Sequence, residues 1–492
     1  MPTSPAAEDR TCPSPPAPPE RGGRRWDLLA AVGAVCFVAV VAVVGTAVEK
    51  ADGTLYVDWP PLYADWLPHV GPGTPAAVVV ALAVVVYGPG LAGRVPWRGV
   101  VLGGWAAGMA WTWALALVDG WYRGVAERLT AEHEYLRAVD RFGDIGAALR
   151  GYTEHILLTQ PDHWPAHVSG HPPAAVLTFV GLDRIGLDGG GWAGAWCITV
   201  GSSAVAAVLV ALRAVAGESS ARRAAPFLVL APAAIWVGAS ADGYFAAVAA
   251  WGLALLALAA TRKVRFRAVT ALGSGLLLGL GCYLSYGLTL IAVPALAVLL
   301  IARTARPLPL VLTGVAVVGG LFTVAGFQWW EAYGLLVERY YQGVGADRPF
   351  SYWVWGNLAN AVIVTGLATV AGVRRAVSAG PGALRRFRTG AVPTGAFRTG
   401  AVRTGAVPTG TVRTGAAGPS DGLVVLVLAA LATIVIADLS GMSKAETERI
   451  WLPFTLWLLP AAALLPARDA RRWLLAQAAV ALLINHLLLT GW

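Results

Sequence analysis

The sequence predicts an all-α protein, a polytopic transmembrane helical bundle. Of its 492 residues, 57% are hydrophobic and only 13% are charged, which is more apolar surface than a soluble domain of this size can bury. Apolar runs of about 18 residues or more recur along the chain, and each is long enough to cross the hydrocarbon layer as a helix. Helices satisfy their own backbone hydrogen bonds, which lipid cannot do. We therefore expect about thirteen or fourteen membrane-crossing helices.

Two polar segments interrupt this apolar pattern. Residues 1–26 are rich in Pro, Ser, Arg and Glu, a composition typical of a disordered tail. Residues 388–417 are six pentads such as RTGAV, whose glycine and β-branched residues disfavour a helix. The expected order is a disordered cytoplasmic tail at 1–26, N-terminal transmembrane helices at 27–118, an extracytoplasmic loop at 119–171, a transmembrane core at 172–373, a cytoplasmic linker at 374–421 and C-terminal transmembrane helices at 422–492.

The positive charge of the chain is local. The formal net charge of the chain is +9. Residues 374–420 contain eight arginines and no acid, so the rest of the chain has a net charge of only +1. This distribution does not indicate a nucleic-acid-binding surface. Arginines also precede the first apolar run, and further basic links at 262–267, 303–306, 374–375 and 468–472 fall on alternate connections. By the positive-inside rule we expect a plasma-membrane protein with a cytoplasmic N-terminus.

One basic link conflicts with this alternation. Counting crossings forward from the loop 119–171 places Arg222 and Arg223 outside the cell, whereas counting backward from Arg262 places them inside. Either one segment between 172 and 239 is re-entrant, or two crossings lie in one run. The sequence leaves both alternatives open.

The segment 119–171 concentrates the groups that can carry chemistry. It holds eight of the 28 acids and five of the seven histidines, and a simple connector between helices would be far shorter. Part of it predicts an amphipathic helix, or two short ones, lying in the outer membrane interface with its apolar stripe in the lipid headgroups. A solvated helix that caps the bundle is the alternative. The apolar positions are Tyr135, Val139, Phe142, Leu149, Tyr152 and Ile156.

Three histidines in this segment have the spacing of metal ligands on a helix. His163, His167 and His171 are separated by four residues each, which places them on one helical face. Pro165 and Gly170 argue against a regular helix there. We therefore favour an interfacial loop with titratable histidines over a metal site.

The sequence Gly170-His171-Pro172-Pro173 opens the next apolar run. Proline suits a helix start because the N–H groups there have no partner within the helix. Together with Asp119, which directly follows the run 98–118, and with the long loop between them, this motif resembles the C-type glycosyltransferases. These integral-membrane enzymes use polyprenyl-phosphate-linked sugars and include protein O-mannosyltransferases and the lipid A aminoarabinose transferase.

Two later patches extend this resemblance in the expected order. The first is the basic link at 222–223 followed by Pro226, Pro232 and Ser240-Ala241-Asp242-Gly243. The second is Glu448-Arg449-Ile450-Trp451-Leu452-Pro453, where an arginine begins a Leu- and Pro-rich helix. The three patches span about 119–466. The chain departs from the family pattern in two ways. Two predicted helices precede the part that resembles the family, and the tandem Asp-Glu often seen there is absent, because Gly120 follows Asp119.

The resemblance implies a carboxylate base, and Asp119 is the first candidate. Since the tandem acid is missing, Glu134, Asp140, Asp58 and Asp52 remain alternatives. A single inverting displacement at the sugar needs one base and a cation beside the lipid phosphate. The candidates for binding the phosphate or the donor are His171, Arg449, Lys444, Arg339 and Arg348.

Supporting roles fall to Asp242 and Glu448. Asp242 could orient the site or join Asp119 around a divalent cation, or simply cap its helix. The implied partners are the lipid bilayer and a polyprenyl-phosphate-linked sugar, and the acceptor hydroxyl is not identified by the sequence.

Two other functional classes stay open. A transporter would place ionisable groups near the middle of the membrane, where the predicted helices are almost free of charge, and would often show an internal repeat. A non-catalytic membrane protein with a degenerate transferase fold is the other alternative.

Overall fold

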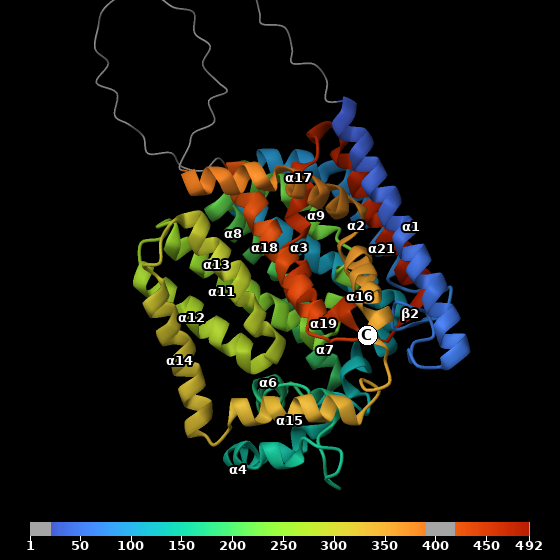
Figure 1. The fold of residues 1–492 in the computed structure, drawn as a ribbon, viewed down its shortest axis with the longest axis vertical. Helices are drawn as coiled ribbons and strands as arrows, with labels where there is room; N and C mark the ends of the chain where they lie inside the picture. Colours follow the sequence, from blue (N-terminus) through green and yellow to red (C-terminus); the bar gives the residue numbers. More distant parts are fainter. Residues whose placement is uncertain (1–20, 390–418, 492) are drawn as a thin grey trace, which may run out of the picture.

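The computed structural model describes residues 21–389 and 419–491, and its regular structure is almost entirely helical (Figure 1). Two strands of three residues, β1 (Ala64–Trp66) and β2 (Leu488–Thr490), pair antiparallel and tie the C-terminal end to the first loop. The fold is all-α, as the sequence predicts. The main long helices are α1 (Arg21–Asp52), α2 (Thr74–Arg94), α3 (Trp97–Ala116), α7 (Gly189–Ser202), α8 (Ala204–Ala216), α11 (Ala241–Ala260), α12 (Arg267–Leu284), α14 (Leu308–Val324), α16 (Phe350–Thr365), α18 (Pro419–Leu439) and α21 (Ala470–Leu487).

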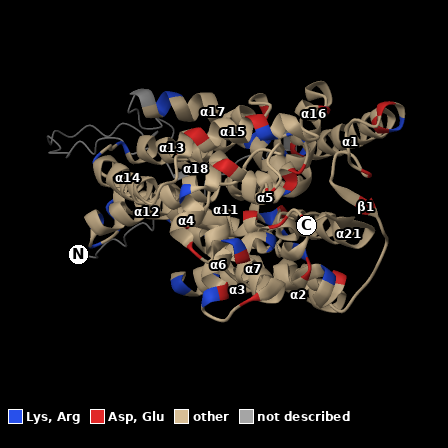
Figure 2. Cartoon of the chain, turned by 90° about the horizontal axis from the view of Figure 1, so that it is seen from below, with Lys and Arg blue, Asp and Glu red and all other residues tan. Residues whose placement is uncertain are grey.

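The protein is a multi-pass membrane protein. Among the described residues, seven helices are long and apolar enough to cross a membrane, or up to nine if each of two bent pairs forms one span. Most of the ribbon in Figure 2 is uncharged, as expected for helices that contact lipid. Continuous spans are fewer than the apolar runs of the sequence, because several runs are broken into short helices.

Proline accounts for two of these breaks, since it lacks an N–H and its ring clashes with the preceding helical turn. Pro232 lies between two short helices in the run 224–239, and Pro453 and Pro460 lie in the run 449–466. The resulting pieces are α9 (Glu218–Val229), α10 (Ala234–Val237), α19 (Thr447–Ile450), α20 (Leu452–Thr455) and the 3₁₀ helix η7 (Leu459–Leu464). Another apolar helix, Tyr286–Ala302, is also shorter than a full span and includes α13 (Ala292–Ala302).

Two helices bend away from the bundle and lie across its ends (Figure 1). The axis turns by 78° between α14 and α15 (Trp329–Gln342), and by 109° between α16 and α17 (Leu367–Thr389). Gly366 makes the second bend with φ 76°, a left-handed conformation that glycine adopts without steric cost.

Two expected boundaries change. The linker expected at 374–421 begins as helix α17, which continues to Thr389, and the pentads from 390 onward lie outside the described residues. The tail expected to be disordered at 1–26 overlaps α1, which begins at Arg21, and residues 1–20 lie outside the described part of the chain.

The basic links gather at one end of the bundle, which we call the basic end. Arg222 donates to the carbonyls of Ala92 and Val95, between α2 and α3, at 2.7 and 2.8 Å. This contact assigns the conflicting link at 222–223 to the same end as the other basic links. Other basic side chains of this end also donate to carbonyls: Lys263 to those of Arg213 and Ala214, Arg303 to those of Arg386 and Phe387, and Arg223 to that of Leu465. Two ion pairs lie here as well, Arg386 with Asp421 and Arg24 with Asp469.

One buried acid also anchors the first helix at the basic end. Asp27 of α1 is almost fully buried and pairs with Arg374 and Arg375 of α17. Much of the remaining surface of α1 is exposed, including Val43 at 70%. This ion pair is therefore a main polar contact of a helix whose surface is largely exposed.

The opposite end, which we call the loop end, holds the segment 119–171, α15 and the connections 53–73 and 439–446. Helix α6 (Ala174–Arg184) has both of its ends here, because Arg184 donates to the carbonyls of Phe142 and Gly143. Its 11 residues extend only about 16 Å, half of a hydrocarbon layer. Of the two alternatives for the counting conflict, we therefore assign α6 as a re-entrant segment that does not cross, and the next candidate span is Gly189–Ala216.

The amphipathic pattern in the segment 119–171 forms three short helices. These are the 3₁₀ helix η4 (Tyr135–Phe142), α4 (Ile145–Arg150) and the 3₁₀ helix η5 (Tyr152–His155). Its apolar stripe does not face lipid headgroups, so that expectation was wrong. Except for the partly buried Val139, the stripe residues are buried against the protein core.

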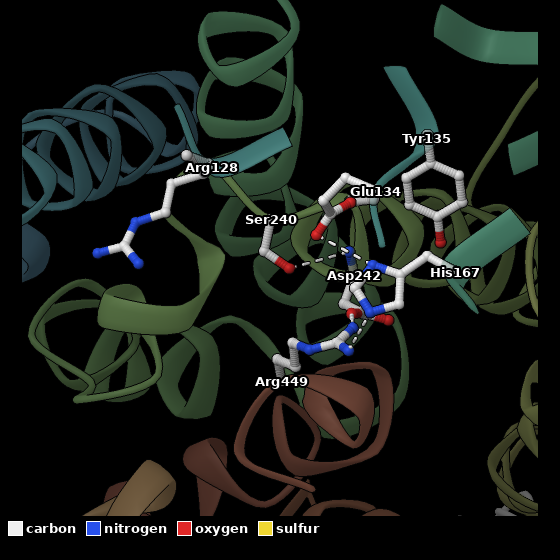
Figure 3. Close-up of a pocket in the computed structure, with 9 residues that line it drawn as sticks. Arg128, Glu134, Tyr135, His167, Ser240, Asp242 and Arg449 are labelled. Atoms are coloured by element: carbon white, nitrogen blue, oxygen red, sulfur yellow. Dashed lines mark hydrogen bonds and ion pairs between the residues drawn. The ribbon is translucent and has the colours of Figure 1, made fainter. Parts of the chain in front are cut away.

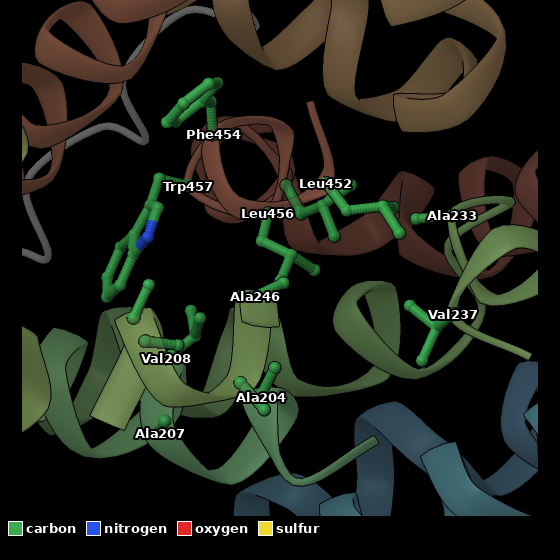
Figure 4. Packing of buried hydrophobic residues seen from close by; sticks show 14 of the residues in the cluster. Ala204, Ala207, Val208, Ala233, Val237, Ala246, Leu452, Phe454, Leu456 and Trp457 are labelled. Atoms are coloured by element: carbon green, nitrogen blue, oxygen red, sulfur yellow. The ribbon is translucent and has the colours of Figure 1, made fainter. Parts of the chain in front are cut away.

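The broken C-terminal segment is held against the centre of the bundle by close packing. Leu452, Leu456 and Trp457 are buried beside α8 and α11 (Figure 4). Alanines such as Ala207 and Ala246 line the facing helices, and small residues let helices approach closely where lipid gives no hydrophobic drive to association. This packing fixes the position of α19, which precedes the packed residues.

The two ends can be tested by cysteine labelling in intact cells. In a variant without its native cysteines, Ser219→Cys at the basic end and Ala346→Cys at the loop end should lie on opposite sides of the membrane. A membrane-impermeant maleimide should label only one of them until the cells are permeabilised. Labelling of both from outside would contradict the re-entrant assignment of α6.

Candidate active site at the loop end

A small pocket at the loop end brings together residues from three distant parts of the sequence (Figure 3). Glu134 and His167 come from the segment 119–171, Asp242 from the start of α11, and Arg449 from α19. The remaining space holds about one water molecule, because the side chains close on one another. Arg128, Tyr135, Ala239, Ser240 and Ala241 complete the lining.

The central contact is an ion pair between Asp242 and Arg449. The two side chains are buried, and Arg449 donates through Nη1 to Oδ2 of Asp242. Ser240 caps α11 by accepting the N–H of Asp242 at 3.2 Å, so Asp242 itself does not cap the helix. Its carboxylate lies in the first helical turn, where the helix dipole favours negative charge. Gly243 allows this start to approach α10, since a Cβ there would lie 2.8 Å from the carbonyl of Val237.

Arg449 also links the pair to the segment 119–171. Its Nη2 lies 2.9 Å from Nε2 of His167 and donates to Glu446 at 2.8 Å. Because a guanidinium only donates, Nε2 of His167 accepts. The other imidazole nitrogen, Nδ1, lies 3.0 Å from Oε1 of Glu134. A continuous polar chain therefore runs from Asp242 through Arg449 and His167 to Glu134.

Burial controls the charges of this chain. Glu134, Asp242 and Arg449 each expose only 4% of their surface. Desolvation raises the pKa of Glu134 to about 7, against the opposing effect of Arg449. Desolvation and then Arg449 lower the pKa of His167 well below its usual range, so this imidazole is neutral. In contrast, the nearby arginines overcome burial and lower the pKa of Glu446.

The backbone around the pocket is strained. Ala239, Ala445 and Glu446 have φ values of 37°, 72° and 58°, a region that side chains other than glycine rarely adopt. Each such residue costs about 1–3 kcal/mol, and such strain clusters at functional sites. The strained residues immediately precede Ser240 and α19, the two elements that present Asp242 and Arg449.

Asp119, the first candidate for the base, lies beside the pocket and does not line it. Its carboxylate contacts His69 at 2.8 Å, Arg128 at 3.4 Å and Arg123 at 3.7 Å. Arg128 in turn lines the pocket and donates to the carbonyl of Thr490. Asp119 thus holds a pocket residue in place, while Glu134, one of the alternatives, is the acid inside the pocket.

The other predicted cations mostly bind backbone carbonyls. Arg348 donates to the carbonyls of Leu55 and Lys444 at 3.0 and 2.8 Å, and Lys444 donates to that of Gly345 at 2.8 Å. These contacts join three connections of the loop end. Arg339 lies on α15, and burial lowers its pKa without an acid among the causes.

Glu448 is buried next to Arg449 in sequence but points elsewhere. It accepts from the N–H of Tyr63 at 3.2 Å and from Asn360 at 3.0 Å. This arrangement ties α19 to the first loop and to α16. Glu448 therefore supports the position of Arg449 and does not line the pocket.

Other predicted site residues lie outside the pocket. Asp140 is exposed and lines a wider hollow with Asp183 and Asp188, and Asp58 is exposed in the first loop. His171 packs against Tyr135 and Phe245, and burial lowers its pKa, which disfavours the protonated form expected to bind phosphate.

The two arrangements considered for a metal ion do not form. His163, His167 and His171 do not converge, because Nδ1 of His163 faces the carbonyl of Trp164 and Nδ1 of His171 faces that of His167. Asp119 and Asp242 are each paired with arginine and do not meet around a cation site.

Several members of the site were not predicted from the sequence, among them Arg128, which lines the pocket. His167 was considered only with its neighbouring histidines, and Glu446 and Ser240 were not selected. Glu446 stands three residues before Arg449, a spacing at which a helical turn brings side chains together, and Ser240 directly precedes a helical run with an acid in its first turn. Both signals are present in the sequence but are common.

No known protein family and no curated protein matches this chain. We therefore infer the function from the geometry of the site and from the three sequence patches.

A double-mutant cycle can test the central ion pair. Arg449→Ala leaves buried carboxylates without their cation and should destabilise the protein by about 3 kcal/mol or more. Asp242→Asn added to it should restore part of the loss, so the two effects should differ from additivity by about 1–3 kcal/mol. Thermal unfolding in detergent measures this, with the exposed Arg137→Ala as a control. Strictly additive effects would contradict the pairing.

Proposed function

We propose that this protein is a membrane glycosyltransferase that moves a sugar from a polyprenyl-phosphate donor to an acceptor hydroxyl. The observation that carries the proposal is the convergence of Glu134, Asp242 and Arg449 in one buried pocket. These residues come from the patches that resemble the C-type glycosyltransferases, or from the loop between them. Their position at one end of a membrane bundle suits a donor whose lipid tail stays in the bilayer.

The proposed roles follow from the charges in the pocket. Arg449 is a buried guanidinium suited to a bidentate grip on the donor phosphate, whose charge it stabilises as the C1–O bond breaks. Asp242 and Glu446 hold Arg449 in position and exchange part of their contacts for the phosphate when the donor binds. Because the ground-state pocket holds only about one water molecule, donor binding must open it.

Glu134 is the proposed base. One of its oxygens, Oε2, is buried and has no hydrogen-bond partner among the described residues, so it can accept the proton of an acceptor hydroxyl. His167 contacts the other oxygen and orients the carboxylate. Attack by the hydroxyl on C1, opposite the leaving phosphate, inverts the anomeric centre. Asp119 then has a positioning role through Arg128.

The proposal includes an orientation in the plasma membrane. The basic end faces the cytoplasm, in line with the positive-inside rule, and the loop end with the pocket faces outward. Acceptors would then be protein, lipid or polysaccharide hydroxyls of the cell envelope. A transporter is less well supported, because the buried charges of the described residues lie at the two ends of the bundle and not near its centre.

Release of polyprenyl phosphate from a labelled donor tests the proposal without a known acceptor. Purified protein in lipid nanodiscs is incubated with a panel of polyprenyl-phosphate sugars and a cell-envelope extract as acceptor. Glu134→Gln should slow the release about 100-fold or more, as expected for the loss of a general base. Arg449→Lys should also slow it, because lysine keeps the charge but cannot make the bidentate contact.

Asp140→Asn is the matched control, since it removes an exposed carboxylate six residues from Glu134 and should leave the rate unchanged. Folding of every variant is checked by its melting temperature. If no donor in the panel is cleaved by the wild type, or if Glu134→Gln keeps full activity, the proposed transferase mechanism is wrong.

A further inference from the structure

Beside the polar chain of the pocket, one group of side chains has the composition of a metal site. Among the described residues, His133, Glu134 and His167 are the one such group, and their ligand atoms all lie within 4.8 Å of one another. The sequence pattern does not indicate these three residues as one metal site, because it groups His167 with His163 and His171 instead. We infer that His133, Glu134 and His167 bind a divalent transition-metal ion of the zinc type.

A backbone hydrogen bond holds the two histidines of this group close together. The N–H of His167 donates to the carbonyl of His133 at 2.9 Å, which joins two segments separated by 34 residues. The two imidazole rings then meet edge to face, with their centroids 4.9 Å apart. Two ligands of a tetrahedral zinc ion are about 3.3 Å apart, given metal–ligand distances of about 2.0–2.1 Å. The group therefore needs only small side-chain movements to close around an ion.

A buried oxygen without a partner supports a small ligand at this place. Oε2 of Glu134 makes no hydrogen bond among the described residues, although Glu134 exposes only 4% of its surface. Leaving a buried carboxylate oxygen unsatisfied is costly, so an occupant is expected there. The pocket has room for about one occupant of the size of a water molecule.

The types of ligand favour zinc over magnesium or calcium. Two imidazoles and one carboxylate match the three-ligand zinc sites that leave a fourth position open, whereas magnesium and calcium prefer oxygen ligands alone. The surrounding charge also accommodates a cation. Asp242 and Glu446 already pair with Arg449, which offsets the repulsion between its guanidinium and a cation.

Metal binding would change one contact of Arg449. An ion on Nδ1 of His167 moves the imidazole proton to Nε2, which can then no longer accept from Arg449. Arg449 would keep its bonds to Asp242 and Glu446 and turn one N–H group toward the pocket. The open metal position and this N–H group would then face the same space, where a hydroxyl or phosphate oxygen fits. The metal site itself does not depend on the proposed transferase activity. An ion held by Oε1 of Glu134, the oxygen beside Nδ1 of His167, would leave Oε2 as the proposed base.

Cobalt(II) is the probe for this site, because its visible absorption reports tetrahedral coordination. The full-length protein, purified without a histidine tag and treated with a chelator, is titrated with cobalt(II) and then with zinc. We expect one cobalt per chain with tetrahedral absorption bands that zinc abolishes. Glu134→Gln and His167→Ala should each weaken binding at least tenfold, with folding checked by melting temperature.

His163→Ala is the matched control, since it removes a histidine of the same segment outside the group. If the two ligand variants unfold, the partly exposed His133→Gln gives the same test at a more tolerant position. Absence of saturable tetrahedral bands, or equal losses in the control and the ligand variants, overturns the metal site. Donor cleavage by metal-free protein without cobalt bands would refute the metal alone, whereas cobalt binding without donor cleavage would refute the transferase alone.

Discussion

The buried pair of Arg449 and Asp242 is the interaction on which the arrangement of the loop end depends. In surroundings of low dielectric constant, an isolated charge is costly, and a pair is tolerated only if its geometry is fixed. Two nearby features fix the geometry of this pair. Ser240 caps the start of α11, which carries Asp242, and the buried segment after α19 holds Arg449 in position. The strained residues before both elements are the cost of bringing these charges into contact.

The same constraint explains the division of the molecule into two ends. Charged side chains lie at the two ends of the bundle, where water or polar partners are available, and not in its apolar middle. At one end arginines bind carbonyls, and at the other end acids, histidines and arginines form a network. The loop end encloses several of its charges in a pocket. Helix α6 contributes to this enclosure, because its Phe179 stacks on Tyr135, which lines the pocket.

The fold class and part of the site were accessible from the sequence. Apolar runs and basic links predict a membrane bundle, and Asp242, Arg449 and Glu134 were among the candidates that meet in the pocket. Which of Asp119 and Glu134 lines the pocket could not be predicted from the sequence, because it depends on which acid the loop turns inward. The short length of α6 was equally hidden, since an apolar run has the same composition whether it crosses the membrane or turns back. Tertiary packing also overrode the interfacial interpretation of the stripe at Tyr135 and Phe142, whose rings were needed in the core.

The ion pair of Asp27 has a consequence for biosynthesis. Its partners Arg374 and Arg375 follow 347 and 348 residues later in the chain. At about 5–20 residues per second, the ribosome needs roughly 20–70 s to make that stretch. Helix α1 must therefore wait in the membrane with its acid at the aqueous surface until α17 has been synthesised. Helix α1 is thus made long before the helix that holds its buried acid, and throughout that interval Asp27 lacks the two arginines that neutralise it in the folded protein.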